Sequence, residues 1–360
     1  MPDQNVAPTT PLPRYGTVAT SGDANQNGKR PAAALEWAPR KKPEISDPLV
    51  HHGRHFGRTV FAFANVHALI LDGLAAREGE IPATAEERRE RRVFVKLLDM
   101  IPNFEDLLHI SPADRVSTFA LLKGANAARS DDTRTLKSAV VDWIAPPDNQ
   151  PLQPRIPHNS KINRGFNHDV TGALLCPTNL DWNNVENRNA LRNKEIIPGG
   201  TDWPLFLYRD EKYDPEDAWR GLLRGRLLVL GFKHVFIAPS SAEESSRATR
   251  AGNARLHGMT RVTPASIAYI ATQIRFALSS SSTFCRTNKD GESELFYHSI
   301  LELLEDPDEI EEVKALLAWW DKRVFPAASN GVRIAPANSA LARIKARHVA
   351  LKDTQANVES

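Results

Sequence analysis

The chain has 360 residues, of which 41% are hydrophobic and 25% charged, and its formal net charge is +2. This composition is typical of globular proteins, and so small a net charge excludes a molecule-wide field that would attract an acidic partner. Two cysteines are too few for a disulfide framework, and no leader-like segment opens the chain. No apolar run reaches the roughly 20 residues of a membrane span. We therefore expect a soluble, intracellular protein without a membrane partner.

Residues 1–47 are predicted to form a disordered basic tail, because they lack periodicity and the apolar area needed to offset chain entropy. Two cationic clusters in this tail are separated by nine residues and resemble a bipartite nuclear localisation signal. The clusters consist of Lys29, Arg30, Arg40, Lys41 and Lys42. We expect a nuclear import receptor as a partner and a nuclear location, with the cytoplasm as the alternative. A merely solvated basic tail is the competing interpretation.

The first helical block is predicted over 54–144. Apolar residues at spacings of three and four indicate a helix at 54–77, and His67 on that face is interpreted as a core histidine. Thr84 and Glu87 have the spacing of a capping box, which predicts a helix that runs to about Met100. A further helix is predicted to start at 111–114, and another to span 131–144 before two prolines end it.

Residues 145–215 are predicted to form a long irregular connection. Prolines enforce an extended path at its start, and 166–176 reads as a short β-hairpin with its turn at Thr171 and Gly172. A connection of this length with little regular structure is unusual and is a place where function can reside.

The second helical block is predicted over 216–325. The helix at 216–236 is apolar on all sides, which indicates burial. A Ser-rich basic loop at 239–260 precedes a helix that starts at Thr263 and Pro264. Two more helices are predicted, one at about 292–304 and one after Asp306. The sequence thus predicts a mostly α-helical fold with a single multi-helix domain over 48–326, followed by a tail at 327–360 in which 337–351 is a candidate basic helix.

Several segments of the chain resemble an uncharacterised protein family that is expanded in mushroom-forming (basidiomycete) fungi. The resemblance covers about 48–326. The segments that carry it include 55–60, 84–90, 128–133, 171–177, 203–204, 214–217, 252–259, 262–269 and 275–280, with Val262-Thr263-Pro264-Ala265-Ser266-Ile267-Ala268-Tyr269 matching best. The resemblance implies no activity, cofactor or catalytic residue.

The segment 219–261 holds eight Lys or Arg against two acids. Four of its arginines alternate with Ser and Thr hydroxyls and could neutralise phosphates of DNA or RNA. These are Arg247, Arg250, Arg255 and Arg261. The alternative is that this segment pairs inside the fold with 292–321, which holds ten acids and one lysine.

Histidine and cysteine side chains are candidate metal ligands and catalytic nucleophiles. His51, His52 and His55 could lie on neighbouring helical turns, but they do not supply a recognised set of metal ligands. Cys176, between Leu175 and Pro177, is interpreted as a buried structural thiol. We therefore predict no metal, cofactor or catalytic residue. The favoured function is a nuclear protein associated with nucleic acid or chromatin. A helical protein-interaction module and an enzyme of unrecognised type are the alternatives.

Overall fold

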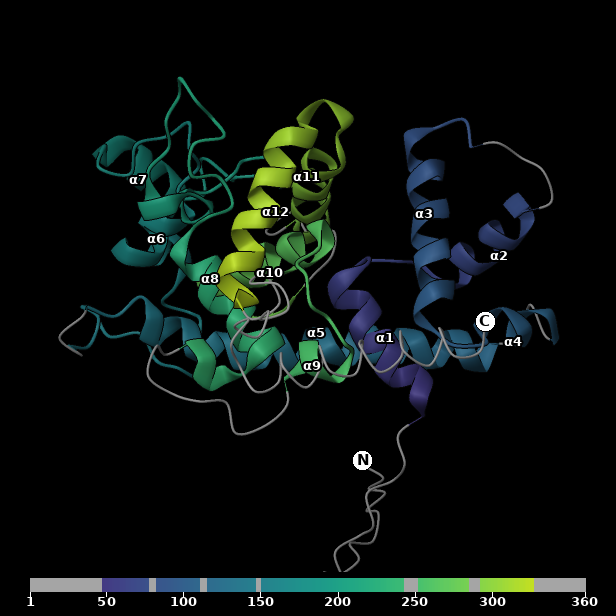
Figure 1. Cartoon of the computed structure of the whole chain (residues 1–360). Coiled ribbons are helices and arrows are strands. Elements are labelled where there is room, and N and C mark those ends of the chain that lie inside the picture. Colours follow the sequence, from purple (N-terminus) through teal and green to yellow (C-terminus); the bar gives the residue numbers. More distant parts are fainter. Residues whose placement is uncertain are drawn as a thin grey trace, which may run out of the picture. The chain divides into compact units, whose positions relative to one another are not determined.

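Helices dominate the computed structural model, which describes residues 47–77, 82–110, 115–146, 150–242, 252–284 and 292–326 (Figure 1). Within these ranges no strand is found, and an isolated bridge joins Pro177 to Pro204. The described helices belong to one domain. The prediction of a mostly α-helical, single-domain fold is therefore confirmed. The predicted tails, with the import signal and the candidate basic helix, lie outside the described residues.

The first predicted helix is in fact two helices, α1 (Pro48–Thr59) and α2 (Val66–Arg77). The Asp47 side chain caps α1 by accepting a hydrogen bond from the Leu49 N–H. Between the two helices the chain turns, where the Ala62 N–H donates to the Tyr297 hydroxyl and Asn65 accepts from the Ala68 N–H. A long-range contact and a local cap thus interrupt a pattern that reads as continuous in the sequence.

The next helix, α3 (Ala85–Met100), has both hydrogen bonds of the predicted capping box between Thr84 and Glu87. A short helix that the sequence did not indicate, α4 (Phe104–Ile110), follows it. The two helices predicted next are one, α5 (Arg115–Trp143), because no residue between 123 and 131 stops it.

Helices α1 and α5 cross at very close range. An added Cβ on Gly53 would collide with the backbone carbonyl of Leu121, and one on Gly124 would collide with the carbonyl of Val50. Both helices therefore need glycine where their backbones meet. This crossing fixes α1, which carries several histidines, on the surface of α5.

The predicted β-hairpin at 166–176 is wrong. These residues form most of a 3₁₀ helix, η2 (Gly165–Asn167), and a helix, α6 (Asp169–Leu175). His168 caps α6, since its Nδ1 accepts from the Val170 N–H, and Gly172 packs under the Trp182 ring instead of forming a turn. The rest of 145–215 is largely irregular, with α7 (Val185–Arg192) and two short 3₁₀ helices, η3 (Leu205–Leu207) and η4 (Arg209–Glu211).

The apolar helix predicted at 216–236 starts ten residues later than expected. Gly221 has φ +77°, where it approaches the Arg209 backbone, and Leu223 also has a positive φ, so the chain turns before α8 (Arg226–Phe232) begins. A π-helix, η5 (Lys233–Ile237), a 3₁₀ helix, η6 (Pro239–Ala242), and the short α9 (Asn253–Leu256) complete this part of the described chain.

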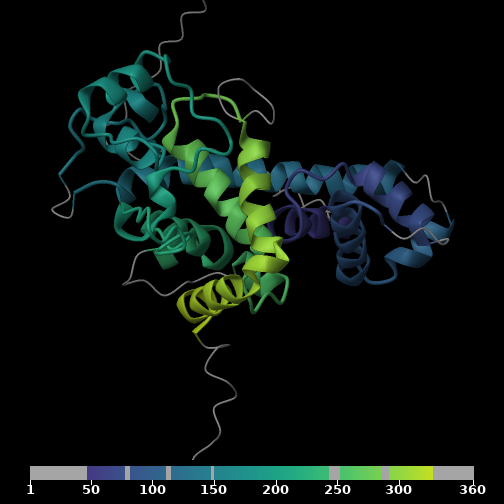
Figure 2. The ribbon, with the colours of Figure 1, turned by 90° about the horizontal axis from the view of Figure 1, so that it is seen from above.

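The helix at the centre of the core is α10 (Pro264–Leu278), of whose 15 residues 13 are buried. It starts as predicted, with Thr263 capping and Pro264 in the first position. It packs against α1, α5, α8 and α11 (Ser293–Glu305), as Figures 1 and 2 show from two directions. A 3₁₀ turn, η7 (Pro307–Glu309), leads into α12 (Ile310–Val324).

Two arginines inside the core form hydrogen bonds with polar partners. Arg58 of α1 donates two 2.7 Å hydrogen bonds to Asp132 of α5, which also accepts from the Tyr269 hydroxyl of α10 at 2.6 Å. The fully buried Arg164 donates to the Ala277 carbonyl at the end of α10, where a cation complements the helix dipole. These bonds tie three helices and the irregular connection to one another.

Candidate nucleic-acid interface

The structure describes two of the four arginines that the sequence singled out. Arg255 lies in α9 and Arg261 between α9 and α10, and both side chains are exposed. Neither forms an ion pair with any residue in the described ranges. Arg247 and Arg250 lie outside the described residues, as do all five residues of the import signal, so their roles stay predictions.

Two residues after Arg255 in the chain, His257 brings the end of α9 against α1. The rings of His257 and His55 stack with centroids 4.3 Å apart and planes 7° from parallel. Asn253 at the start of α9 donates to the Val235 carbonyl of η5, which fixes the helix on its other side. This contact between distant parts of the sequence brings the end of α9, the helix that carries Arg255, to the histidines of α1.

The surroundings of these histidines disfavour the charged form of the ring. Burial, and then His257, Arg58 and His52, lower the pKa of His55 to about 4. Burial first, and then His52, Arg58, His51 and Arg54, lower the pKa of His257. Burial and His51 lower the pKa of His52. Burial and the neighbouring basic groups thus both disfavour protonation of these three rings.

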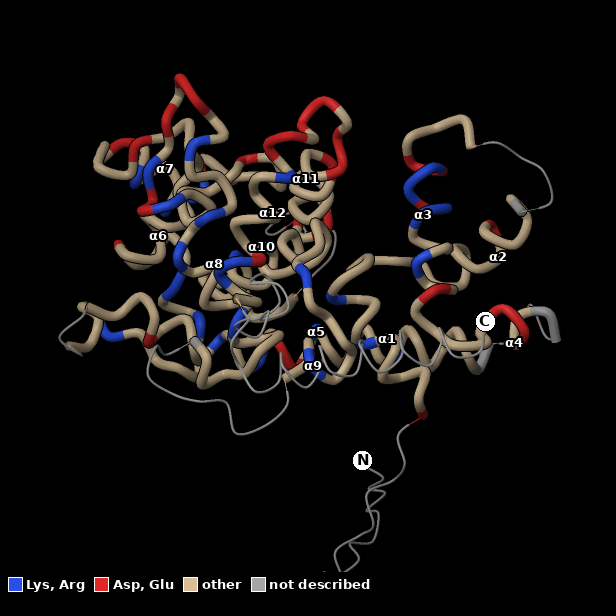
Figure 3. The backbone as a smooth tube through the Cα atoms, viewed as in Figure 1, with Lys and Arg blue, Asp and Glu red and all other residues tan. Residues whose placement is uncertain are grey.

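We call this region the α1–α9 surface. It consists of His51, His52, Arg54, His55, Arg255 and His257. The Nδ1 atoms of His52 and His55 are buried without a hydrogen-bond partner in the part of the chain that is described. Figure 3 shows Lys and Arg in blue on α1 and α9, while the acidic residues in red gather where α11 meets α12.

One cation of the α1–α9 surface is partly neutralised. Arg54 forms a 2.7 Å ion pair with Asp131, which also receives Arg134 at 3.3 Å. The hydrogen bond from Arg54 lowers the pKa of the Asp131 carboxyl, so this anion is fully charged at neutral pH. An anionic ligand would therefore depend mainly on Arg255 and the histidines.

The alternative pairing of 219–261 with 292–321 does not take the form of ion pairs among the residues described in those segments. Arg220 pairs with Asp214, and Arg224 lies over the Trp319 ring. The carboxylates of Glu302 and Glu305 pair instead with arginines of α3. Two hydrogen bonds do join the segments, from the Trp219 ring to the Glu309 carboxylate and from the Trp320 ring to the Leu223 carbonyl.

Other reactive side chains have structural surroundings. Cys176 is fully buried, as predicted, and burial raises the pKa of its thiol to about 11, which disfavours the nucleophilic thiolate. Cys285 lies outside the described residues. In the described ranges, no three His, Cys, Asp or Glu side chains gather in a metal-binding arrangement, and no helix has the length and hydropathy that crossing a bilayer requires.

In the sequence, His51, His52 and His55 were recognisable only as candidate metal ligands. Nothing in the local sequence around His257 indicated that it lies beside them. Their meeting depends on the packing of α9 against α1, for which neither local sequence contains a signal. The run of histidines in one helix was the available clue.

Fold and surface together define a mostly helical, single-domain protein with an exposed basic and histidine-rich surface beside α9. The chain belongs to a family of unknown function, DUF6698, which matches residues 123–325. The match begins within α5, so that α1 to α4 precede it, whereas α9 and α10 fall inside it. No curated protein and no solved structure matches the chain.

Proposed function

We propose that this protein binds nucleic acid through phosphate contacts made by Arg247, Arg250, Arg255 and Arg261, together with the α1–α9 surface. The observation that carries the proposal is that Arg255 is exposed, has no described carboxylate partner, and lies two residues before His257, whose ring stacks on that of His55. Guanidinium and imidazole N–H groups are donors that suit phosphate oxygens.

The chemistry of the surface favours a ligand with several negative charges. A phosphate placed here would replace the missing counter-charge of the histidines and raise their pKa values, so that they would become protonated as they bind. Contacts of this kind position a nucleic acid but do not read base sequence. We therefore propose a binding mode with little sequence preference.

The proposal is tested by measuring the affinity of the full chain for labelled duplex DNA and for RNA by fluorescence anisotropy. We expect Arg255→Glu and Arg261→Glu to weaken binding about tenfold each, because each replaces a phosphate contact with a repulsion. The loss should be similar for unrelated sequences.

Arg88→Glu is the matched control, since it makes the same change of net charge on the first turn of α3, whose start is far from α9 (Figure 1). Its affinity should stay within about twofold of the unchanged protein. Equal losses in all three variants would indicate a non-specific effect of net charge. The absence of binding to either nucleic acid at low salt would refute the proposal.

We also propose a nuclear location, which is supported by the spacing of the two basic clusters in the N-terminal segment. Replacement of Lys29, Arg30, Arg40, Lys41 and Lys42 by Ala should redistribute a fluorescently tagged full chain to the cytoplasm, because the acidic grooves of an import receptor would lose their cationic ligands. Unchanged nuclear accumulation would contradict this proposal, and it would leave the nucleic-acid proposal to its own test.

A further inference from the structure

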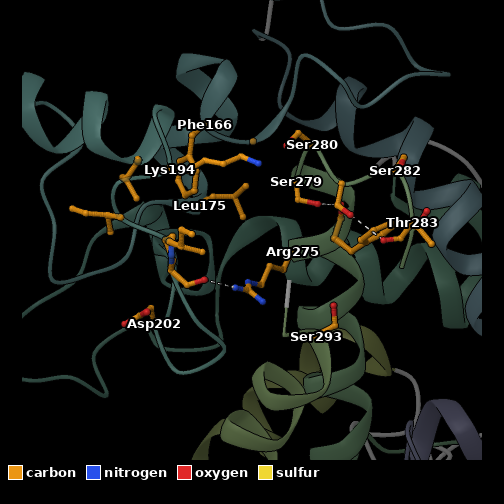
Figure 4. A pocket seen from close by; sticks show the side chains of 17 residues that line it. Phe166, Leu175, Lys194, Asp202, Arg275, Ser279, Ser280, Ser282, Thr283 and Ser293 are labelled. Atoms are coloured by element: carbon orange, nitrogen blue, oxygen red, sulfur yellow. Dashed lines mark hydrogen bonds between the residues drawn. The ribbon is translucent and has the colours of Figure 1, made fainter. Parts of the chain in front are cut away.

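A cavity of about 590 Å³ lies between the irregular connection and the end of α10, away from the α1–α9 surface (Figure 4). Its volume falls in the range of sites that hold small organic molecules. All of its lining residues lie within the segment that the family match covers. The site proposed above does not use this cavity.

One wall of the cavity is apolar. It is formed by side chains from η2, α6 and α7 and from the turn after α7, together with Phe276 of α10. The members are Phe166, Leu175, Leu191, Ile196, Ile197 and Phe276. Such a wall excludes water from the apolar part of a ligand and provides most of the binding free energy of small molecules.

The opposite wall is rich in hydroxyl groups. Ser279 to Thr283 follow the end of α10, and Gly165, with φ +67°, lets the connection approach Ser280 closely. The Ser279 and Ser281 hydroxyls donate to the carbonyls of Phe276 and Thr283. The Ser280 hydroxyl forms no hydrogen bond with a described residue, so it can donate to a ligand.

Two cations line the cavity, and they differ in their surroundings. Arg275 donates to the carbonyls of Pro198 and Gly199, and its charge is partly offset by Asp202 and Glu292. Lys194 extends past Phe166 and Leu175 toward Ser279 and Ser280 (Figure 4), and its ammonium group forms no hydrogen bond or ion pair with any described residue.

We propose that this cavity binds a small organic acid with an apolar body, such as a medium-chain carboxylate. The acid group lies between the Lys194 ammonium and the Ser280 hydroxyl, and the apolar body lies against Phe166 and Leu191. A single unpaired cation suits a ligand with one negative charge. A second charge, as in a phosphate ester, would meet Asp202, which also lines the cavity.

The test uses the full chain and the fluorescent probe 8-anilinonaphthalene-1-sulfonate, a monoanion with an apolar body, which is then displaced with octanoate or octanol. We expect octanoate to displace the probe at about tenfold lower concentration than octanol, because only octanoate forms the charge-assisted contact. Equal potency of the two competitors, or no displacement by octanoate at millimolar concentration, would overturn the proposal.

Variants then locate the site. Lys194→Gln should abolish the advantage of octanoate, and Lys194→Glu should reverse it, while octanol is unaffected. Lys212→Glu is the matched control, because Lys212 is exposed and does not line the cavity. Ile197→Trp, at a side chain that is 56% exposed, should fill the recess and weaken both competitors without unfolding the protein. An octanoate advantage that survives Lys194→Glu would refute the assignment of Lys194.

Discussion

At the scale of single residues, Lys161 shows how burial changes a side chain. It is 6% exposed, and its Nζ lies 3.1 Å from the centroid of the Phe276 ring and 3.4 Å from the Ser279 Oγ. Burial, and then Arg164 and Lys137, lower its pKa to about 6, so the amine is mostly neutral at pH 7.5. In the unfolded chain it would carry a proton up to a pKa of about 10.4.

We predict that Lys161→Met stabilises the protein at pH 7 by about 1–3 kcal/mol, because it removes a group that must lose its proton or its hydration on folding. Between pH 6 and 10 the unfolded state of the unchanged protein binds more protons, so its stability rises with pH, and the variant should lose this dependence. Urea denaturation at pH 7, 8 and 9 measures both effects. A less stable variant at pH 7 would show that the amine forms a favourable interaction in the fold.

His55 provides a second prediction, with the same sign of pH dependence over a lower pH range. Its folded pKa of about 4 lies below the unfolded value of about 6.5. The contribution of neutral His55 to the free energy of unfolding is therefore fully present above pH 6.5 and decreases as the pH falls toward 4. His55→Gln should therefore show a smaller loss of unfolding free energy between pH 7 and 5 than the unchanged protein. Parallel losses in denaturation experiments at the two pH values would exclude His55 as the source.

The residues also show what the sequence could predict. Cys176 is buried as expected, since its apolar neighbours in the chain are buried too. His67, expected in the core, is exposed, because α2 packs through Val66, Leu69 and Ile70. The stack of His55 on His257 had no signal in the sequence, since it depends on two helices meeting in space.

At the scale of elements, the crossing of α1 and α5 gives the most specific prediction. Gly→Ala inside a helix normally stabilises it by about 1 kcal/mol. Gly53→Ala and Gly124→Ala should nevertheless destabilise this protein by about 1–3 kcal/mol each, because the new methyl groups collide with backbone atoms that cannot move aside.

Gly231→Ala in α8 is the matched control for these variants. There the nearest atom is a side-chain carbon of Ile274 at 2.9 Å, which can shift, so the loss should be smaller. Thermal unfolding of the three variants compares them directly. If the Gly53→Ala variant were at least as stable as the unchanged protein, the close crossing of α1 and α5 would be disproved.

The sequence predicted elements well where their ends are determined locally. The starts of α3 and α10 follow from Thr84 with Glu87 and from Thr263 with Pro264. The prediction failed where contacts between distant residues determine the structure. One case is the break between α1 and α2 beside Tyr297. Another is the wrongly predicted hairpin, where His168 and Trp182 stabilise a helix. Most apolar residues of the segment 216–236 are buried as predicted, but its helix begins only at Arg226.

At the scale of the whole molecule, a net charge of +2 hides an uneven distribution. Acidic residues gather where α11 meets α12, whereas α1 and α9 carry arginines (Figure 3). A nucleic acid should therefore bind at one region of the surface. The sequence located both charge runs, but it could not show that the carboxylates of Glu302 and Glu305 pair with α3 and leave Arg255 unpaired.

The proposed binding should also depend on pH, because bound phosphates would raise the lowered pKa values of His52, His55 and His257. We predict that DNA affinity increases at least about threefold when the pH falls from 7.5 to 5.5. His257→Gln should reduce this increase. An affinity independent of pH would exclude the histidines from the interface and leave the arginine contacts to be tested separately.

The dependence of DNA affinity on salt tests phosphate binding most directly. If all four arginines contact phosphates, the logarithm of the association constant should fall with the logarithm of salt concentration with a slope of about −3.6. Arg255→Glu and Arg261→Glu should each make this slope shallower by about one, while Arg88→Glu leaves it unchanged. A slope near zero, or one that the Arg255 and Arg261 variants do not alter, would contradict a phosphate-binding role for these arginines.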